Sequence, residues 1–203
     1  VATNKLQGIF GKLSAVLYYK DLGVLNIPTM KLPLLTSFIG ASLGALAIQS
    51  IRPELLVNLI PWLVGIVAVY FIFSPRIGDL DTQQRMCVVV FALTITIFIG
   101  FYDGFLGPGS GCLFVLSFVS LLGYNLSKAT AYTRLLLLAT NLASLGIFIL
   151  GGNIVWRVGL CMAIGQWIGA RIGSRTVMLK GSQLIRPMLV SVCLLLIVKM
   201  VFF

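Results

Sequence analysis

The chain has 203 residues, of which 59% are hydrophobic and 10% are charged. No soluble domain of this size has that composition, which instead indicates a polytopic helical membrane protein. The net charge of +10 does not indicate nucleic-acid binding, because the fifteen Lys and Arg residues are spread one or two per loop without a basic tract.

A helix that spans the hydrocarbon core needs about 20 apolar residues. On this measure the sequence predicts helices at about 2–20, 31–51, 54–73, 86–105, 128–150, 154–175 and 184–203, and a short helical segment at about 110–123. Clusters of Gly, Pro, Asn and charged residues mark the breaks between them. The predicted fold is therefore an all-α, multi-pass membrane protein.

The sequence contains no histidine, and its four cysteines are isolated within apolar segments without a CxxC pair. His-based metal sites and Ser-His or Cys-His catalysis are thereby excluded, and neither a disulfide framework nor a zinc site is indicated. Asp103 has no second carboxylate beside it in the sequence and no partner nucleophile. We therefore expect no enzyme, no catalytic residues, no metal and no cofactor.

An internal repeat is visible. The stretch "VATNKL" (1–6) matches "TAYTRL" (130–135) and places Lys5 opposite Arg134, while "SFIGASLGALA" (37–47) matches "CMAIGQWIGAR" (161–171). We assign residues 1–80 to the first transmembrane repeat and 81–203 to the second. The chain begins without methionine inside a predicted helix, so we expect that an N-terminal piece holding the first repeat's own hairpin is missing.

The orientation of the repeats follows from the loop charges. The segment from Met86 to Ile99 rises past the bilayer midplane, whereas the helix at 110–123 is only about 20 Å long, so the two form a re-entrant hairpin. Nine Lys and Arg residues then lie on the cytoplasmic side and two outside. Counting the hairpin as one crossing makes the repeats parallel and the division six to five. The positive-inside rule favours inverted repeats.

The sequence "GFYDGFLGPGSG" (100–111) interrupts two very apolar runs. Irregular backbone survives at membrane depth only where protein or a water-filled cavity satisfies its polar groups. Gly107, Gly109 and Gly111 allow a sharp turn, after which Ser110 is a suitable N-cap for a helix that directs its N–H groups at an anion. The alternative is that these glycines only let helices pack closely.

Four charged residues are predicted at membrane depth: Asp103, Lys5, Lys12 and Arg134. Lys5 and Arg134, one from each repeat, would form a basic pocket that Asn141, two turns after Arg134, also faces. Alternatively, Lys5 snorkels to the headgroups. Lys12 lies two turns after Lys5 on the same helix face, and Asn141 replaces it in the second repeat.

Asp103 is the single carboxylate in an apolar setting. It either neutralises Arg134 or Lys12 as a structural partner or takes up a proton during transport. The paired motifs "GASLG" (40–44) and "GQWIG" (165–169) are GxxxG patterns, for which helix packing is the first interpretation. Gln166, central in its helix, is a further candidate for lining a pathway.

The motifs "GFYDGFLGPGSG", "ATAYTRLLLLATNLASLGIFILGG" and "VATNKLQGIFGK" resemble the TauE/SafE family of membrane transporters, in particular its YfcA-type members. The resemblance covers the whole chain and implies a secondary transporter of the bacterial inner membrane. Its expected substrates are sulfite or sulfur-containing organic anions.

The leading hypothesis is a carrier in which a small anion binds near Ser110, Gly111, Arg134 and Lys5 while two inverted halves rock around it. The alternatives are a channel-like anion pore and a non-transporting membrane scaffold. The expected partners are the small anion and the lipid bilayer, without nucleic acid. The sequence leaves open whether the protein is a homo-oligomer.

Overall fold

The structure is a computed structural model that describes residues 2–50, 83–151 and 156–180. Within these ranges the regular structure is entirely helical, so the all-α prediction is confirmed. The elements in chain order are α1 (Ala2–Asp21), η1 (Ile27–Met30), α2 (Lys31–Gln49), α4 (Val88–Phe91), the π-helical turn η2 (Ala92–Thr96), α5 (Ile97–Phe105), α6 (Ser110–Leu122), α7 (Leu126–Leu150) and α8 (Trp156–Lys180). The helices predicted at 54–73 and 184–203 lie outside the described residues.

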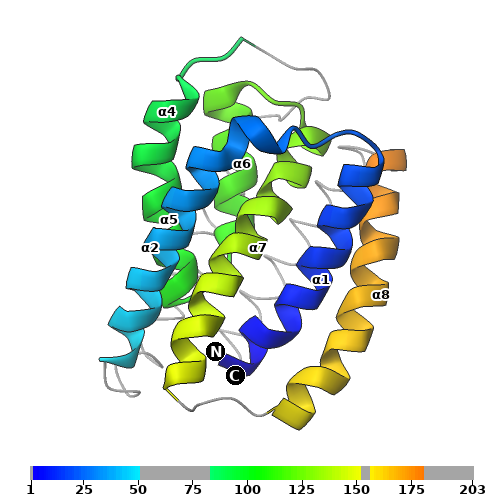
Figure 1. Cartoon of the computed structure of the whole chain (residues 1–203). Coiled ribbons are helices and arrows are strands. Elements are labelled where there is room, and N and C mark those ends of the chain that lie inside the picture. Colours follow the sequence, from blue (N-terminus) through cyan, green and yellow to red (C-terminus); the bar gives the residue numbers. More distant parts are fainter. Residues whose placement is uncertain (1, 51–82, 152–155, 181–203) are drawn as a thin grey trace, which may run out of the picture.

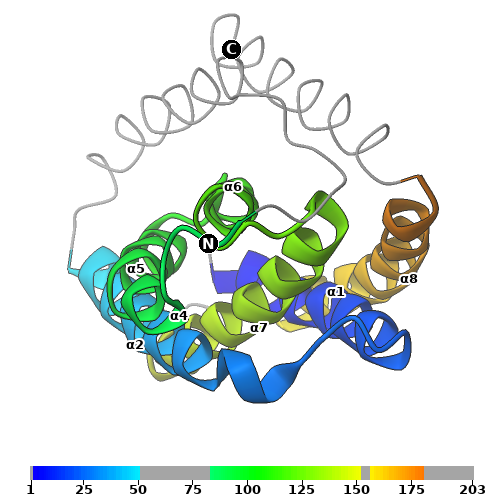
Figure 2. The same ribbon diagram turned by 90° about the horizontal axis from the view of Figure 1, so that it is seen from above.

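Helix α7 is the centre of the described bundle (Figure 1). It packs against α1 on one side and against α2 on the other, and it also contacts the shorter helices α5 and α6. Seen from above, α2 with α5 and α1 with α8 form two pairs on opposite sides of α7 (Figure 2). A helix in this position carries side chains that can meet residues of every other element.

Helices α2 and α5 meet by direct backbone contact. A Cβ atom added at Gly40 or Gly44 of α2 would overlap the carbonyl oxygen of Ile97 or Phe101. In the opposite direction, a Cβ added at Gly100 or Gly104 of α5 would overlap carbonyl oxygens of α2. The packing interpretation of "GASLG" is therefore confirmed, and α5 contributes a second small-residue motif that fits it.

The second motif behaves differently. A Cβ atom added at Gly165 or Gly169 of α8 meets no atom of the described residues within 4 Å, and both glycines are exposed. Gln166, between them, is exposed as well, but its Oε1 would lie 2.8 Å from a Cβ at Gly11 of α1. In the described part of the chain, α8 therefore contacts α1 at Gln166 and at Gly159, whose Cβ would lie 2.6 Å from Leu6, rather than through the glycines of this motif.

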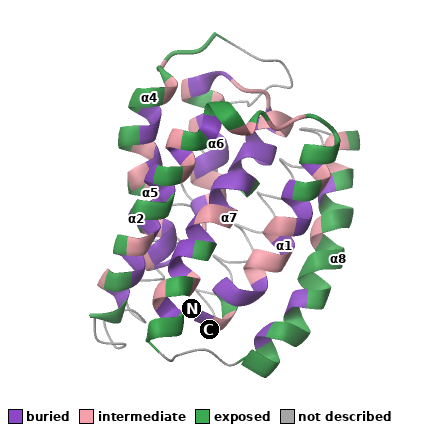
Figure 3. Cartoon of the chain, in the orientation of Figure 1, coloured by how far each residue is buried: buried purple, intermediate pink, exposed green. Residues whose placement is uncertain are grey.

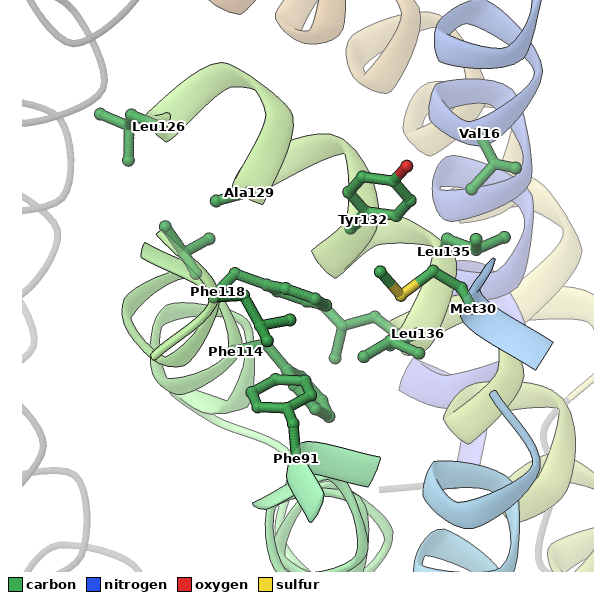
Figure 4. Packing of buried hydrophobic residues seen from close by; sticks show 13 residues of the cluster. Val16, Met30, Phe91, Phe114, Phe118, Leu126, Ala129, Tyr132, Leu135 and Leu136 are labelled. Carbon is green, nitrogen blue, oxygen red and sulfur yellow. The ribbon is translucent and has the colours of Figure 1, made fainter. Parts of the chain in front are cut away.

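A cluster of large apolar side chains joins the hairpin to α7 near the start of α4 (Figure 4). The rings of Phe91 and Phe118 lie 5.1 Å apart, and Phe118 lies 5.9 Å from Tyr132 of α7. The Tyr132 hydroxyl accepts a hydrogen bond of 3.0 Å from the backbone N–H of Asn26. This cluster fixes the base of the hairpin and leaves its opposite end to the polar residues described below.

Burial differs strongly between helices (Figure 3). Much of α7 is buried, whereas α8 exposes large apolar side chains, among them Ile164 at 67%. Among the described residues, three helical segments are long and apolar enough to cross a membrane: Ile27–Gln49, Val88–Phe105 and Leu126–Leu150. Helix α1 forms within one residue of its predicted bounds, whereas α8 continues to Lys180, five residues beyond its predicted end. Both helices carry more charged residues than the three apolar spans. Exposed apolar faces beside such spans are suited to lipid.

The ends of α6 and α7 follow from local chemistry. Gly123, at φ 70°, ends α6 in the left-handed conformation, and the N–H of Tyr124 donates to the carbonyl of Phe118. The side chain of Asn125 then accepts a hydrogen bond of 2.9 Å from the N–H of Lys128. Because Asn125 caps the helix, α7 begins at Leu126, two residues before the predicted start.

Candidate functional site

The segment from Val88 to Leu122 is a helical hairpin with a short tip. Helix α5 ends at Phe105 and α6 begins at Ser110. At the other end, the backbone N–H groups of Arg85 and Met86 both donate to the carbonyl of Leu121, at 2.9 and 3.0 Å. The two ends of the hairpin therefore lie together, as the hairpin prediction requires. Its depth in a bilayer remains a prediction.

The tip depends on glycine at two positions. Gly107 and Gly109 have φ angles of 89° and 82°, a region that other residues enter only with strain. Helix α6 starts at Ser110 as predicted, but its N-cap is Gly109, so the assignment of Ser110 as the cap is wrong. Ser110 is the first helical residue, and its Oγ instead donates to the carboxylate of Asp103 and lies 2.8 Å from the carbonyl of Gly107.

Asp103 is the centre of a buried polar cluster in which four helices meet. It is 2% exposed, and its Oδ1 accepts from Ser110 of α6. Its Oδ2 accepts from the ammonium group of Lys5 in α1 and from the hydroxyl of Thr140 in α7, both at 2.7 Å. Lys5 also donates to the backbone carbonyl of Asp103. One carboxylate thus joins α5, α6, α1 and α7.

Lys5 is the ion-pair partner of Asp103, which corrects the sequence-based choice of Arg134 or Lys12. Lys5 is 4% exposed and its ammonium group points to the hairpin tip. The alternative in which Lys5 snorkels to the headgroups is therefore wrong. Because a buried ion pair with this geometry satisfies both charges, Lys5 holds the hairpin tip against α1.

The remaining predicted cations are differently placed. Among the described residues, the ion pairs are Lys5–Asp103 and the exposed Arg171–Asp21, so neither Lys12 nor Arg134 is paired there. Arg134 is exposed on α7, and Lys12 is half-buried on α1. Lys12 is electrostatically coupled to the cluster, because Asp103 and Lys5 both act on its charge, and Arg134 acts on Lys12 as well.

Asn141 is 1% exposed on α7, and its Oδ1 has no hydrogen-bond partner among the described residues. Gly8 of α1 lies against it, since a Cβ at Gly8 would lie 2.7 Å from Asn141 Nδ2 and 3.4 Å from Lys12 Nζ. Gly111 faces α7 instead, where a Cβ would lie 3.2 Å from Leu137. The structure therefore brings Asn141 and Lys12 together and gives Gly111 apolar surroundings.

Sequence reasoning missed two members of the site. Thr140 looked like one hydroxyl among several on an apolar helix, and Gly8 carried no recognisable motif. The spacing gives no signal for Thr140 either, because it lies six residues after Arg134, about 240° around the helix, and so on a different face. For Gly8 no signal was present. Within the described residues, no group of three or more His, Cys, Asp or Glu could hold a metal ion.

Replacing Gly107 with alanine is expected to destabilise the hairpin tip by about 1–2 kcal/mol, the cost of a left-handed conformation for a residue with a Cβ. The new Cβ would also lie 3.6 Å from the Lys5 ammonium. The measurement is thermal unfolding of the purified protein in detergent. Gly146→Ala is the matched control, because Gly146 lies within α7 and a Cβ there meets none of the described atoms within 4 Å. Equal melting temperatures for the two variants would contradict the assigned strain.

Comparison with known proteins shows the family of this chain. The sequence profile of the family described as "Sulfite exporter TauE/SafE" matches residues 1–200. The chain belongs to the TauE/SafE family. It is 43% identical over 202 residues to a "Probable membrane transporter protein" of Haemophilus influenzae, covering 100% of this chain and 79% of that relative.

Two further relatives of this TauE/SafE protein are similarly close. The "Probable membrane transporter protein YfcA" of Escherichia coli K12 is 42% identical over 202 residues, which cover 100% of this chain and 75% of the relative. The "Probable membrane transporter protein ORF9" of Sinorhizobium sp is 42% identical over 200 residues, or 98% of this chain and 77% of the relative. No solved structure matches the chain.

Proposed function

We propose that this protein is a multi-pass transporter of the bacterial inner membrane that moves small anions, such as sulfite or sulfur-containing organic anions. The family description and the names of the relatives support transport as the activity. The anion binds beside the hairpin tip, where α1, α5, α6 and α7 meet. The proposed contact residues are drawn from Lys5, Gly107, Gly109, Ser110, Gly111, Arg134 and Asn141.

The observation that carries the proposal is the charge imbalance around Lys12. Asp103, Lys5 and Arg134 all act on the charge of Lys12, and Asp103 is the single carboxylate among these groups. Since Asp103 is already paired with Lys5, two cations remain without a counter-charge among the described residues. Cations at membrane depth are costly unless a partner neutralises them. A small anion is the partner that this arrangement favours.

We infer that transport proceeds by alternating access between two inverted repeats, residues 1–80 and 81–203. The packing of α7 on α2 and of α1 on α8 supports the inference, because the sequence repeat pairs α1 with α7 and α2 with α8. Helix α1 of the first repeat thus packs on α8 of the second, and α7 of the second repeat packs on α2 of the first. In known inverted-repeat transporters, substrates bind at such a repeat interface near interrupted helices.

Replacing Arg134 with alanine is expected to reduce anion flux by about tenfold or more, because a charged hydrogen-bonding group contributes about 1.5–3 kcal/mol to binding. The measurement is uptake of labelled sulfite by proteoliposomes that contain equal amounts of folded protein. Arg157→Ala is the matched control, since Arg157 is an exposed arginine at the start of α8. Unchanged flux in Arg134→Ala would remove Arg134 from the site.

The same flux assay separates the carrier from a channel-like pore. A carrier with one site per cycle gives a rate that saturates as the anion concentration rises. A pore gives flux that fails to saturate and exceeds carrier rates. If the wild-type protein moves no anion across the bilayer, a non-transporting scaffold becomes the better description of this chain.

A further inference from the structure

Lys5, which the sequence repeat places opposite Arg134, is already paired with Asp103. Lys5 donates to the Asp103 carboxylate at 2.7 Å and to the same residue's backbone carbonyl, and it is 4% exposed. To bind an anion, Lys5 would have to leave these buried partners and expose an uncompensated carboxylate. A resting anion site built on Lys5 is therefore disfavoured, and another cation on the same helix has to be considered.

Lys12 is that cation. It lies seven residues after Lys5, or about 10 Å along the same face of α1. It is half-buried and has no hydrogen bond or ion pair with any described residue. The Asp103 carboxylate acts on the charge of Lys12, but it is already paired with Lys5. An ammonium group removed from water without a partner is energetically costly. This arrangement is stable when a ligand supplies the missing negative charge.

Gly8 lets the side chains of Asn141 and Lys12 lie close to the backbone of α1. A Cβ at Gly8 would come within 2.7 Å of Asn141 Nδ2 and 3.4 Å of Lys12 Nζ. Two nitrogen donors, one from each repeat, therefore lie near each other at Gly8, between α1 and α7. A single oxyanion has enough oxygen atoms to accept hydrogen bonds from both donors at once.

The amide oxygen of Asn141 adds a requirement on the ligand. This oxygen is an acceptor with no partner in the described part of the chain, although Asn141 is 1% exposed. Buried acceptors are normally satisfied, because an unmade hydrogen bond costs about 1–3 kcal/mol in desolvation. A ligand that completes the site therefore has a hydrogen-bond donor as well as a negative charge.

We propose that Lys12 and Asn141, which meet at Gly8, form the anion subsite, and that it prefers small oxyanions that carry their own hydroxyl group. Lys12 neutralises the charge, the Asn141 amide nitrogen donates to an anionic oxygen, and the Asn141 oxygen accepts from the hydroxyl. Lys5 and Asp103 hold the hairpin tip in this state, so the inference removes Lys5 from the contact residues proposed above. The inference rests on the anion-transport function proposed above and specifies its site and ligand class.

The test uses a matched pair of sulfonates. Isethionate has the hydroxyl group that ethanesulfonate lacks, and the dissociation constant of each is measured by calorimetry with the purified protein. Wild-type protein is expected to bind isethionate about tenfold more tightly. Lys12→Met is expected to weaken both ligands at least tenfold, and Lys12→Arg to retain binding. Asn141→Leu is expected to abolish the preference for isethionate.

Gly8→Ala is a second, independent variant, because its added Cβ would displace the Asn141 amide and should thereby weaken both sulfonates. It decides the outcome if Asn141→Leu does not fold. Unchanged binding in Lys12→Met, or an equal affinity of the wild-type protein for the two sulfonates, overturns the subsite and leaves anion transport standing. A wild-type protein that neither binds nor transports any small anion overturns the proposed function itself.

Discussion

Replacing Asp103 with asparagine is expected to destabilise the protein more than any other conservative change at the site. The carboxylate has two oxygens that receive hydrogen bonds from Lys5, Ser110 and Thr140. Asparagine keeps the shape but removes the charge and puts an N–H₂ group where one acceptor was. Lys5 is then a buried cation without a counter-charge, which costs about 3–5 kcal/mol.

The measurement is the thermal unfolding temperature in detergent, which should fall by roughly 10 °C for a chain of this length. The double variant Lys5→Met with Asp103→Leu is the control, because it removes both charges and leaves apolar groups in their place. Such replacement of a buried pair is often close to neutral. The double variant should therefore unfold at a higher temperature than Asp103→Asn. The reverse order would show that the pair does not set the stability of the tip.

Transport by these variants separates the two roles that the sequence left open for Asp103. If Asp103 is a structural partner of Lys5, the charge-free double variant keeps a substantial part of the anion flux along with its stability. If the carboxylate takes up a proton in each cycle, flux is lost in both variants and does not follow stability. The comparison uses the same proteoliposome assay as Arg134→Ala.

Replacing Gly44 with alanine is expected to disturb the contact between α2 and the hairpin. The added Cβ would overlap the backbone carbonyl of Phe101, and a backbone atom cannot rotate away as the end of a side chain can. The helices must separate, which removes the neighbouring contacts of Gly40 and Gly104 as well. Overpacking of this kind costs about 1–3 kcal/mol or more.

Gly169→Ala is the matched control, since Gly169 occupies the corresponding place in the second GxxxG motif. A Cβ there meets no described atom within 4 Å. Alanine is favoured over glycine in a helix by about 1 kcal/mol, so this variant should be neutral or slightly more stable. Opposite signs for the two substitutions in thermal unfolding are the expected result. A similar loss at both positions would mean that both glycines contact a helix in the folded protein.

The helices within the described ranges could be predicted closely from the sequence, because run length and helix breakers are local properties. The hairpin turn at Gly107 and Gly109 was predictable for the same reason: each position needs a residue without a Cβ. The close packing at Gly40 and Gly44 also followed from spacing alone. The error at Ser110 arose because a hydroxyl that can cap a helix can equally donate to a carboxylate.

The contacts that join distant helices could not be predicted in this way. Lys5 and Asp103 are 98 residues apart in the chain, and three cations were available to one carboxylate. The choice among them depends on the rotation of α1 about its axis and on its distance from the hairpin tip. The two glycine motifs look equivalent in the sequence. Among the described residues, however, α5 packs on Gly40 and Gly44, and no helix packs on Gly165 and Gly169.

The π-helical turn at Ala92–Thr96 determines which way the hairpin tip faces. Such a turn holds one residue more than the α-helical path needs, so every residue after it is rotated by about 100° relative to an uninterrupted helix. Deleting one residue within the turn would shorten this side of the hairpin by only about 1.5 Å. It would also rotate α5, so that its Gly100–Gly104 face would turn away from α2 and Asp103 would turn away from Lys5. Alignment gaps at this position among relatives would therefore mark proteins with a different tip, even where the glycine motif is intact.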